Sequence, residues 1–260
     1  MPDPRLLILI PSYNTGRILR ETVISAMAQE PPVWVVVDGS TDGSEESIRD
    51  LATSQPGKFR ILVIPQNSGK GAAILHALRE AIAAGFTHVL TMDADGQHPA
   101  GQVPLFVEWS RKHPSAAVFG CPIFDDSAPA LRVNGRKVSN FWAALETLGW
   151  GIRDSLFGMR VYPAADLLAV MEATRFARRF DFDPEVAVRL AWRGVPLINL
   201  PTPVRYPSAE EGGISQFRYL RDNTLLTWMY FRLFFGFLVR LPRLLFRGKN
   251  PLHHVIPPVR

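Results

Sequence analysis

The sequence predicts an α/β fold with a mostly parallel sheet flanked by helices, and three observations support it. Short β-branched runs alternate with helix-like segments over residues 1–120, a pattern typical of strands joined by crossover helices. Apolar residues make up 47% of the 260-residue chain, which is enough for a sizeable core. The charged share is only 20%, which excludes wholesale disorder.

The elements of this half follow from hydrophobic runs and from the residues that interrupt them. Strands are expected to end at polar turn residues, and helices at prolines or glycines. We expect strands at 6–10, 33–37, 60–64, 88–92 and 116–119. We expect helices at 18–29, 44–53, 71–84 and 103–112.

Polar clusters directly follow the first four predicted strands. They are residues 11–14, 38–44, 67–71 and 93–97. Since the carboxyl ends of parallel strands form the ligand crevice of such sheets, the clusters predict one shared site. The second cluster alone is also typical of an Asx turn. Arg49 at its twelfth place excludes a calcium loop, and Gly71 after Lys70 excludes a Walker phosphate loop.

Asp93 and Asp95 are the most informative pair, because two carboxylates at the end of an apolar strand repel each other. A bound Mn²⁺ or Mg²⁺ that also holds a diphosphate would offset this repulsion, with the Gln97 carbonyl as a further oxygen ligand. Two solvated turn acids are the simpler alternative. A phosphatase with an Asp nucleophile is disfavoured by the position of the motif after the fourth strand. We treat His98 as a turn residue.

These motifs resemble those of the inverting, family 2 glycosyltransferases of GT-A fold, which have a Rossmann-like sheet, and especially the branch of dolichyl-phosphate mannose synthase and other polyprenyl-phosphate glycosyltransferases. The resemblance runs from Leu6 to about Phe217. Its motifs are Ile10-Pro11-Ser12-Tyr13-Asn14, Val37-Asp38-Gly39-Ser40-Thr41-Asp42, Asn67-Ser68-Gly69-Lys70-Gly71 and Asp93-Ala94-Asp95-Gly96-Gln97. It implies that the nucleotide-sugar is bound by Pro11, Tyr13, Asn14, Asp38, Lys70, Asp93 and Asp95. It implies a Mn²⁺ or Mg²⁺ site at Asp95, Gln97 and Asp93.

The second half of the chain is expected to shape the acceptor side. The segment from Asp154 to Arg160 resembles the family's Asp-x-x-x-Gly-x-Arg motif beside the sugar. Asp183 and Glu185 begin a helix that Gly194 closes, and they resemble the acidic segment at the family's active site, although acids are also common at helix N-termini. A predicted helix over 135–147 and the residues before it supply candidates for binding an acceptor phosphate, unless they form an ordinary polar face. These are Arg132, Arg136, Ser139 and Asn140.

One segment departs from the pattern of the family. Polyprenyl-phosphate enzymes continue with Arg and then Gly-x-Ser-Lys, but residues 206–216 carry two acids and a Gln instead. The acceptor is therefore either a polyprenyl phosphate or a hydroxyl of a lipid or glycolipid. A phosphate needs no base, whereas a hydroxyl needs a carboxylate, for which Asp183 is the first candidate and Asp154 the second.

The last 47 residues are basic, with eight Lys or Arg against one acid, and rich in aromatic residues. On a helical wheel, six arginines from Arg218 to Arg247 share an arc on the order of 100° wide, and apolar residues fill most of the rest. This pattern predicts an amphipathic helix in the headgroup plane of an anionic membrane, bent or ended by Pro242. A homodimer contact through the same helix is the alternative. Nucleic acid is not the expected partner.

The expected organisation is a glycosyltransferase domain at 1–213, with a nucleotide-sugar half at 1–120 and an acceptor half at 121–213, and a membrane-interface tail at 214–260. No signal peptide is evident, the uncharged stretches are too short to span a bilayer, and the lone Cys121 suits a reducing compartment. We therefore expect a cytoplasmic protein, peripheral on the inner face of the membrane. An inactive nucleotide-sugar-binding or scaffold protein is the alternative function. The donor is either UDP-linked or GDP-linked.

Overall fold

The computed structural model describes residues 4–124, 130–204 and 219–252, without the side chains of 130–133 and 219. A seven-stranded sheet in the order β3-β2-β1-β4-β6-β5-β7 forms its centre, and β6 runs antiparallel to both neighbours. The strands are β1 (Leu6–Ser12), β2 (Val33–Asp38), β3 (Phe59–Ile64), β4 (His88–Thr91), β5 (Ala117–Ile123), β6 (Arg160–Pro163) and β7 (Leu197–Pro203). The predicted α/β fold with a mostly parallel sheet is therefore confirmed.

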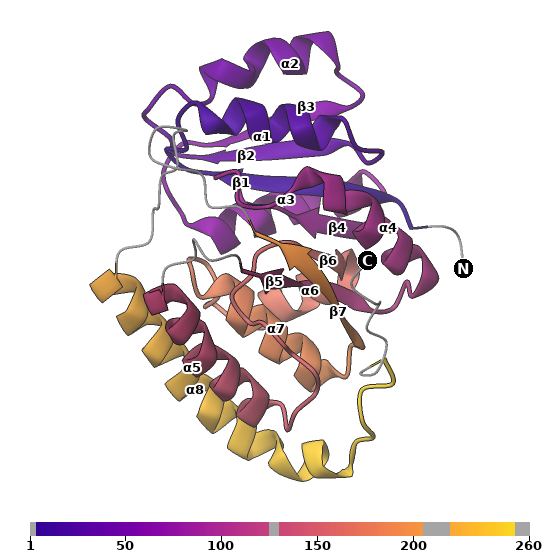
Figure 1. Ribbon diagram of the computed structural model, residues 1–260, viewed down its shortest axis with the longest axis vertical. Helices are drawn as coiled ribbons and strands as arrows, with labels where there is room; N and C mark the ends of the chain where they lie inside the picture. The colour runs from indigo at the N-terminus through magenta and orange to yellow at the C-terminus, as the bar shows by residue number, and fades with distance from the viewer. Residues whose placement is uncertain (1–3, 125–129, 205–218, 253–260) are drawn as a thin grey trace.

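Helices cover both faces of this sheet (Figure 1). They are α1 (Ile18–Met27), α2 (Arg49–Ser54), α3 (Lys70–Ala83), α4 (Val103–Lys112), α5 (Ala130–Glu146), α6 (Ala164–Glu172), α7 (Phe182–Arg193) and α8 (Tyr219–Phe246), with short 3-10 turns at Glu46–Ile48 and Ala100–Gln102. The helix expected at 44–53 is thus a 3-10 turn followed by a short α-helix. Gly194 ends α7 in the left-handed conformation with φ of 82°, as expected of a glycine cap.

Alternate residues of the strands feed two cores, one on each face of the sheet. Leu7 and Leu9 of β1 pack with α3, α6 and α7, whereas Ile8 and Ile10 pack with α1 and α4. This division follows from the two-residue period of a strand. Because both faces are covered, β2 is buried along its whole length, which explains its continuous apolar sequence.

The second half contains elements that the sequence did not reveal. β6 pairs with β4 and β5 and leads directly into α6, and β7 adds a parallel edge next to β5. Both strands contain prolines, and β6 begins with Arg160, so neither shows the apolar pattern of a buried strand.

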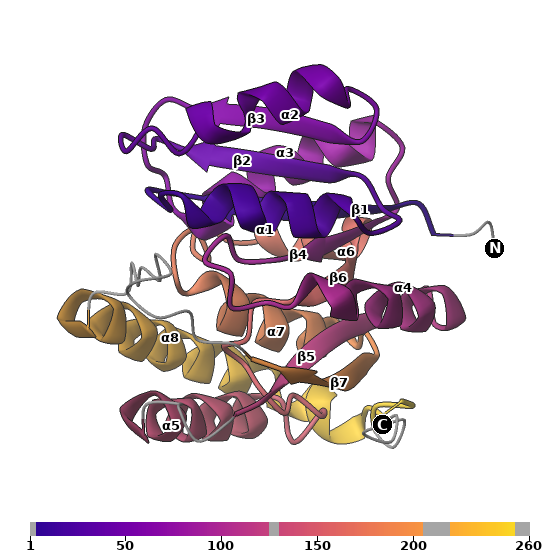
Figure 2. The ribbon, with the colours of Figure 1, turned by 45° about the horizontal axis from the view of Figure 1, so that its top comes forward.

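α5 and α8 lie side by side at the end of the molecule away from β3 in both views (Figure 1, Figure 2). α8 continues through Pro242, so this proline does not end the helix, and the bend expected as the alternative stays a prediction. Met229, Leu233 and Phe237 of α8 are buried in the same core as α7. The predicted boundary between 213 and 214 lies outside the described residues, and α8 beyond it packs on the domain.

Candidate active site

The four polar clusters meet at one cavity of about 880 Å³ at the carboxyl ends of β1 to β4. This arrangement follows from the parallel strands, whose carboxyl ends share one edge. The cavity extends to α7 and then between α5 and α8. The predicted site residues that line it are Pro11, Tyr13, Asn14, Asp38, Lys70, Asp93, Asp95, Gln97, Arg136, Ser139 and Asp183.

Asp38 holds the loop that carries the third cluster. Its two carboxylate oxygens accept hydrogen bonds from the backbone amides of Ser68 at 2.8 Å and Gly69 at 2.7 Å. A side chain at the next residue, Gly39, would place Cβ 2.4 Å from the Asn67 amide nitrogen, so this close approach requires glycine. Asn14 links two other loops, because its Oδ1 accepts a hydrogen bond from the Thr41 amide at 2.8 Å.

Lys70, at the start of α3, joins two carboxylates of the site. Its Nζ lies 2.6 Å from Asp93 Oδ1 and 2.6 Å from Asp183 Oδ2. Burial alone would lower the pKa of Lys70, but the charges of Asp183 and Asp93 raise it above its ordinary value. Burial alone would raise the pKa of Asp93, but the Lys70 ammonium holds it below its usual range. Lys70 therefore offsets the charge of Asp93, a role that the sequence led us to expect of a bound ion.

Asp95 has less compensation than Asp93. Burial and the charge of Asp93 raise its pKa, while its Oδ1 accepts a hydrogen bond from the Gln97 amide at 3.1 Å. Among the described residues, no three His, Cys, Asp or Glu side chains gather around one point. Mg²⁺ and Mn²⁺ suit such a site, because one or two carboxylates, phosphate oxygens and water complete their coordination. The donor set at Asp95 and Gln97 therefore fits a cation held jointly with a diphosphate.

Asp183 and Asp154 are placed differently. The Asp183 carboxylate borders the cavity, and its buried Oδ1 has no hydrogen-bond partner among the described residues. Asp154 is buried beside the cavity. Its Oδ1 accepts hydrogen bonds from Arg136 Nη1 at 2.7 Å and from the amides of Leu156 at 3.0 Å and Phe157 at 2.7 Å. The geometry therefore favours Asp183 as a proton acceptor, and Asp154 holds a loop.

Arg160 is fully buried and contacts the backbone of two site residues. Its Nη1 donates to the Asp183 carbonyl at 2.7 Å, and its Nη2 donates to the Asp154 carbonyl at 3.2 Å. Its guanidinium lies 4.3 Å from the centre of the Phe119 ring. Arg160 therefore positions both acidic segments, and it does not itself line the cavity.

The predicted acceptor residues are only partly brought together. Arg136 and Ser139 line the cavity. Asn140 instead accepts a hydrogen bond from the Ser155 amide at 2.8 Å and holds the loop after α5. The side chain of Arg132 lies outside the described residues.

Two residues that sequence reasoning missed contribute to the site. His98 Nδ1 accepts a hydrogen bond from the Asp93 amide at 2.9 Å, and burial lowers the pKa of His98 to about 4, so the ring is neutral. Arg179 lines the cavity and donates to Asn67 Oδ1 at 3.3 Å. The pair of arginines just before the acidic helix could have indicated Arg179, whereas no pattern in the neighbouring sequence indicated His98.

α8 turns an apolar face outwards. Its exposed large apolar residues are Leu220, Trp228, Phe231, Phe235, Leu238, Val239, Leu245 and Phe246, and α5 adds Val138, Phe141 and Leu145. The expected arginine arc only partly faces solvent. Arg232 is paired with buried Glu185 at 2.8 Å, and Arg247 donates to the Thr147 carbonyl at 2.7 Å. These two arginines of the arc are therefore engaged by the domain, and the contact of the helix with a membrane stays a prediction.

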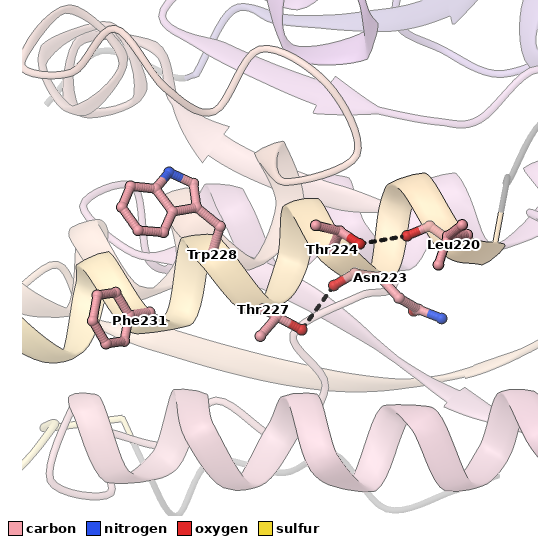
Figure 3. A pocket seen from close by; sticks show the side chains of 6 residues that line it. All are labelled: Leu220, Asn223, Thr224, Thr227, Trp228 and Phe231. Carbon is pink, nitrogen blue, oxygen red and sulfur yellow. Dashed lines mark hydrogen bonds between the residues drawn. The ribbon is translucent and has the colours of Figure 1, made fainter.

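A shallow groove of about 850 Å³ follows the first turns of α8 (Figure 3). The hydroxyls of Thr224 and Thr227 donate to the helix backbone at 2.8 Å each, so the groove presents mainly carbon atoms. Asn223, Thr227 and Phe231 line both this groove and the active-site cavity. An apolar surface thus leads from the outside of α8 towards the carboxylates.

Length and composition alone would allow α8 to cross a membrane. Within Leu220–Phe246, the most apolar 18-residue window has a mean hydropathy of 1.3, and 22% of that window is buried on the domain. The uncharged stretches within it are still as short as expected, because Arg232 and Arg240 interrupt them. The ion pair of Arg232 with Glu185 and the packing on α5 and α7 instead hold the helix along the side of the domain.

Comparison with known proteins agrees with this geometry. The family described as "Glycosyl transferase family 2" matches residues 7–166. The chain is 28% identical over 237 residues to "Glycosyltransferase AglJ" of Haloferax volcanii, which covers 87% of the chain and 71% of that relative. It is 24% identical over 205 residues to the "Polyprenol monophosphomannose synthase" of Mycolicibacterium smegmatis, which covers 77% of each protein.

A solved structure shares the fold. It is the glucosyl-3-phosphoglycerate synthase from Mycobacterium tuberculosis, in complex with Mn²⁺, UDP and glucosyl-3-phosphoglycerate. The TM-score is 0.65 at 17% sequence identity, and the match covers 91% of this chain and 80% of the other. The likeness agrees with the GT-A fold that the motifs predicted.

Proposed function

Because the chain belongs to glycosyl transferase family 2 and is a glycosyltransferase, we propose that it moves a sugar from a nucleotide-diphosphate donor to a lipid-type acceptor, with inversion at the anomeric carbon. One observation carries the proposal. A single cavity joins the carboxylates at the strand ends to the apolar side chains of α5 and α8. Such a cavity suits two substrates of opposite character, a charged donor and a hydrocarbon-bearing acceptor.

The donor occupies the end of the cavity formed by the polar clusters. Tyr13 and Pro11 contact the nucleotide base and ribose, while Asp38 and Asn14 keep the surrounding loops in place. Asp95 and Gln97 would hold a Mn²⁺ or Mg²⁺ ion, which would offset negative charge on the diphosphate. In support, the solved structure with the same fold contains Mn²⁺ and UDP.

The chain's own residues act on the departing diphosphate and on the acceptor. As the bond from sugar to diphosphate breaks, negative charge grows on the leaving group, and the nearby Lys70 and Arg179 stabilise it. The acceptor attacks the opposite face of the sugar, which inverts the anomeric configuration. A hydroxyl acceptor passes its proton to Asp183, whereas a phosphate acceptor needs no base.

The acceptor occupies the other end of the cavity, where Arg136 and Ser139 approach its polar group. Trp142 of α5 and Leu226 and Phe234 of α8 supply an apolar wall for a hydrocarbon chain. In support, the relative from Mycolicibacterium smegmatis is named for a polyprenol acceptor. Both phosphate and hydroxyl lipids remain candidates, because Arg136 is also paired with Asp154.

The outward apolar residues of α5 and α8 hold the protein on the inner face of the membrane, with residues 214–260 as the interface segment. Trp228, Phe231 and Phe235 insert among the headgroups, and the exposed Arg243 meets anionic lipids. This arrangement delivers a lipid acceptor to the cavity without removing it from the bilayer. A homodimer through the same face is the competing arrangement, and salt-sensitive flotation with anionic vesicles distinguishes the two.

A two-substrate assay tests the function. UDP- and GDP-linked sugars are each supplied with Mn²⁺ and with vesicles that contain a polyprenyl phosphate or a lipid with a free hydroxyl. We expect release of the nucleoside diphosphate together with a glycolipid of inverted anomeric configuration, and loss of both in Asp95→Ala. Full activity of that variant would contradict the metal site, and transfer to water alone would contradict the lipid acceptor.

A further inference from the structure

Glu185 connects the candidate active site to α8. It lies in the first turn of α7, two residues after Asp183, and it is fully buried. Its carboxylate accepts hydrogen bonds from Arg232 of α8 at 2.8 Å and from Arg189 of its own helix at 2.8 Å. The Arg232 guanidinium also lies 3.5 Å from the centre of the Phe176 ring, in the segment that leads into α7. Arg232 therefore contacts α7 and the segment before it together.

The first turn of α7 is held from three separate elements. Lys70 of α3 contacts the Asp183 carboxylate at 2.6 Å, and Arg160 of β6 contacts the Asp183 carbonyl at 2.7 Å. Arg232 supplies the third contact through Glu185. Phe182 and Val186 of this turn are also buried in the core, so the contact through Glu185 adds a connection to α8 that core packing alone does not supply.

We infer that Arg232 is a positioning residue for glycosyl transfer and that α8 is part of the catalytic framework. Through Glu185, Arg232 fixes the position of the first turn of α7. It thereby fixes the positions of the Asp183 carboxylate and of the Lys70 ammonium bonded to it. This inference rests on the proposed function for the roles of Asp183 and Lys70. It holds for either acceptor, because a hydroxyl acceptor uses Asp183 as base and a phosphate acceptor still requires Lys70 beside the leaving diphosphate.

Arg189 provides a matched control within the chain. Its side chain and that of Arg232 are similarly buried, with 17% and 13% exposed, and both pair with Glu185. Of these two arginines, Arg232 is the one that reaches Glu185 from another helix. Arg189→Met therefore removes one charge from Glu185 but keeps the connection to α8. Arg232→Met breaks that connection and leaves Glu185 paired with Arg189, so the buried carboxylate keeps a partner.

The experiment compares Arg232→Met, Arg232→Lys and Arg189→Met with Arg79→Met, which breaks an exposed ion pair with Glu172, in the full chain. Steady-state release of nucleoside diphosphate measures kcat and the donor KM, and amide hydrogen exchange follows residues 182–186 independently of activity. For Arg232→Met we expect kcat to fall at least about tenfold with the donor KM within about twofold, because a small misplacement of reacting groups is costly. Of the three methionine variants, only Arg232→Met should show faster amide exchange at 182–186. Arg232→Lys should show kcat and exchange values between those of the wild type and those of Arg232→Met.

Equal behaviour of Arg232→Met and Arg189→Met in both measurements would overturn the inference. If Arg232→Met does not fold, a folded Arg232→Lys with wild-type kcat and wild-type exchange at 182–186 overturns it equally. If the wild-type protein releases no nucleoside diphosphate from any donor, the proposed function fails. The exchange comparison still decides whether α8 positions α7.

Discussion

Replacing Lys70 by methionine removes the positive charge that Asp93 and Asp183 share. Methionine keeps much of the apolar stem, but both carboxylates, each 2.6 Å from Nζ, lose their common partner, and the side chains of Asp183 and Asp93 are only 8% and 33% exposed. Removing one partner of a buried ion pair costs about 3–5 kcal/mol, whereas an exposed pair is worth about 0–1 kcal/mol. We therefore expect Lys70→Met to lower the free energy of unfolding by about 3 kcal/mol or more.

The loss should depend on pH in a defined direction. In the wild type, Lys70 holds the pKa of Asp93 below its unfolded value, so this carboxylate adds stability above that value and loses it as the pH falls. Without Lys70, burial acts on Asp93 unopposed by that charge and raises its pKa. The variant then loses stability as the pH rises. We therefore expect the difference in free energy of unfolding between wild type and variant to be larger at about pH 8 than at about pH 5.

Urea denaturation followed by circular dichroism at both pH values measures this effect. Arg79→Met is the control, because Arg79 pairs with Glu172 at 2.9 Å with side chains 58% and 48% exposed. A loss below about 1 kcal/mol for Lys70→Met, or an equal loss at both pH values, would refute the account of Lys70 as the internal counter-ion.

Three further predictions concern other parts of the chain. Glu146 is fully buried, and burial and the charge of Glu185 raise its pKa to about 8. The free energy of unfolding of the wild type should therefore fall between about pH 5 and pH 8. Over that range Glu146→Gln should gain roughly 3 kcal/mol of unfolding free energy relative to the wild type in denaturation curves. The same pH dependence in both proteins would contradict this. Asp154→Ala should lower the free energy of unfolding by about 2–3 kcal/mol, because two backbone amides and Arg136 lose their acceptor, and an unchanged unfolding midpoint would count against it. Serine at both Phe235 and Val239, which are 53% and 81% exposed, should reduce vesicle co-sedimentation at least about fivefold without altering nucleotide-dependent thermal stabilisation; undiminished sedimentation would exclude this face as the membrane contact.

The sheet of the first half could be predicted because each strand carries its own apolar run and ends in a polar cluster. β2 is buried along its whole length and reads as a continuous apolar run that ends at Asp38. β6 could not be predicted in this way, because its first residue, Arg160, is a buried cation compensated by contacts from distant segments. The two-residue period identifies a strand from the apolar residues that face a core. It does not identify a strand that buries a charged residue together with its partners.

The candidate site was partly predictable for the same reason. Residues at the ends of neighbouring parallel strands must meet, so Tyr13, Asp38 and Asp95 were expected to share a cavity. The contact between Lys70 and Asp183 spans 113 residues and has no local pattern. The arginine arc of α8 was visible on a wheel, but the buried carboxylate that engages Arg232 lies 47 residues away.

Calorimetric titration of a nucleoside diphosphate with and without Mn²⁺ tests most directly whether Asp95 and Gln97 hold a cation together with the donor. UDP and GDP are each titrated into the wild type and into Asp95→Asn. We expect one of them to bind the wild type at least about tenfold more tightly with Mn²⁺, and this gain to disappear in the variant. Equal affinity with and without Mn²⁺ in the wild type, or an unchanged gain in Asp95→Asn, would contradict the proposed metal and diphosphate site.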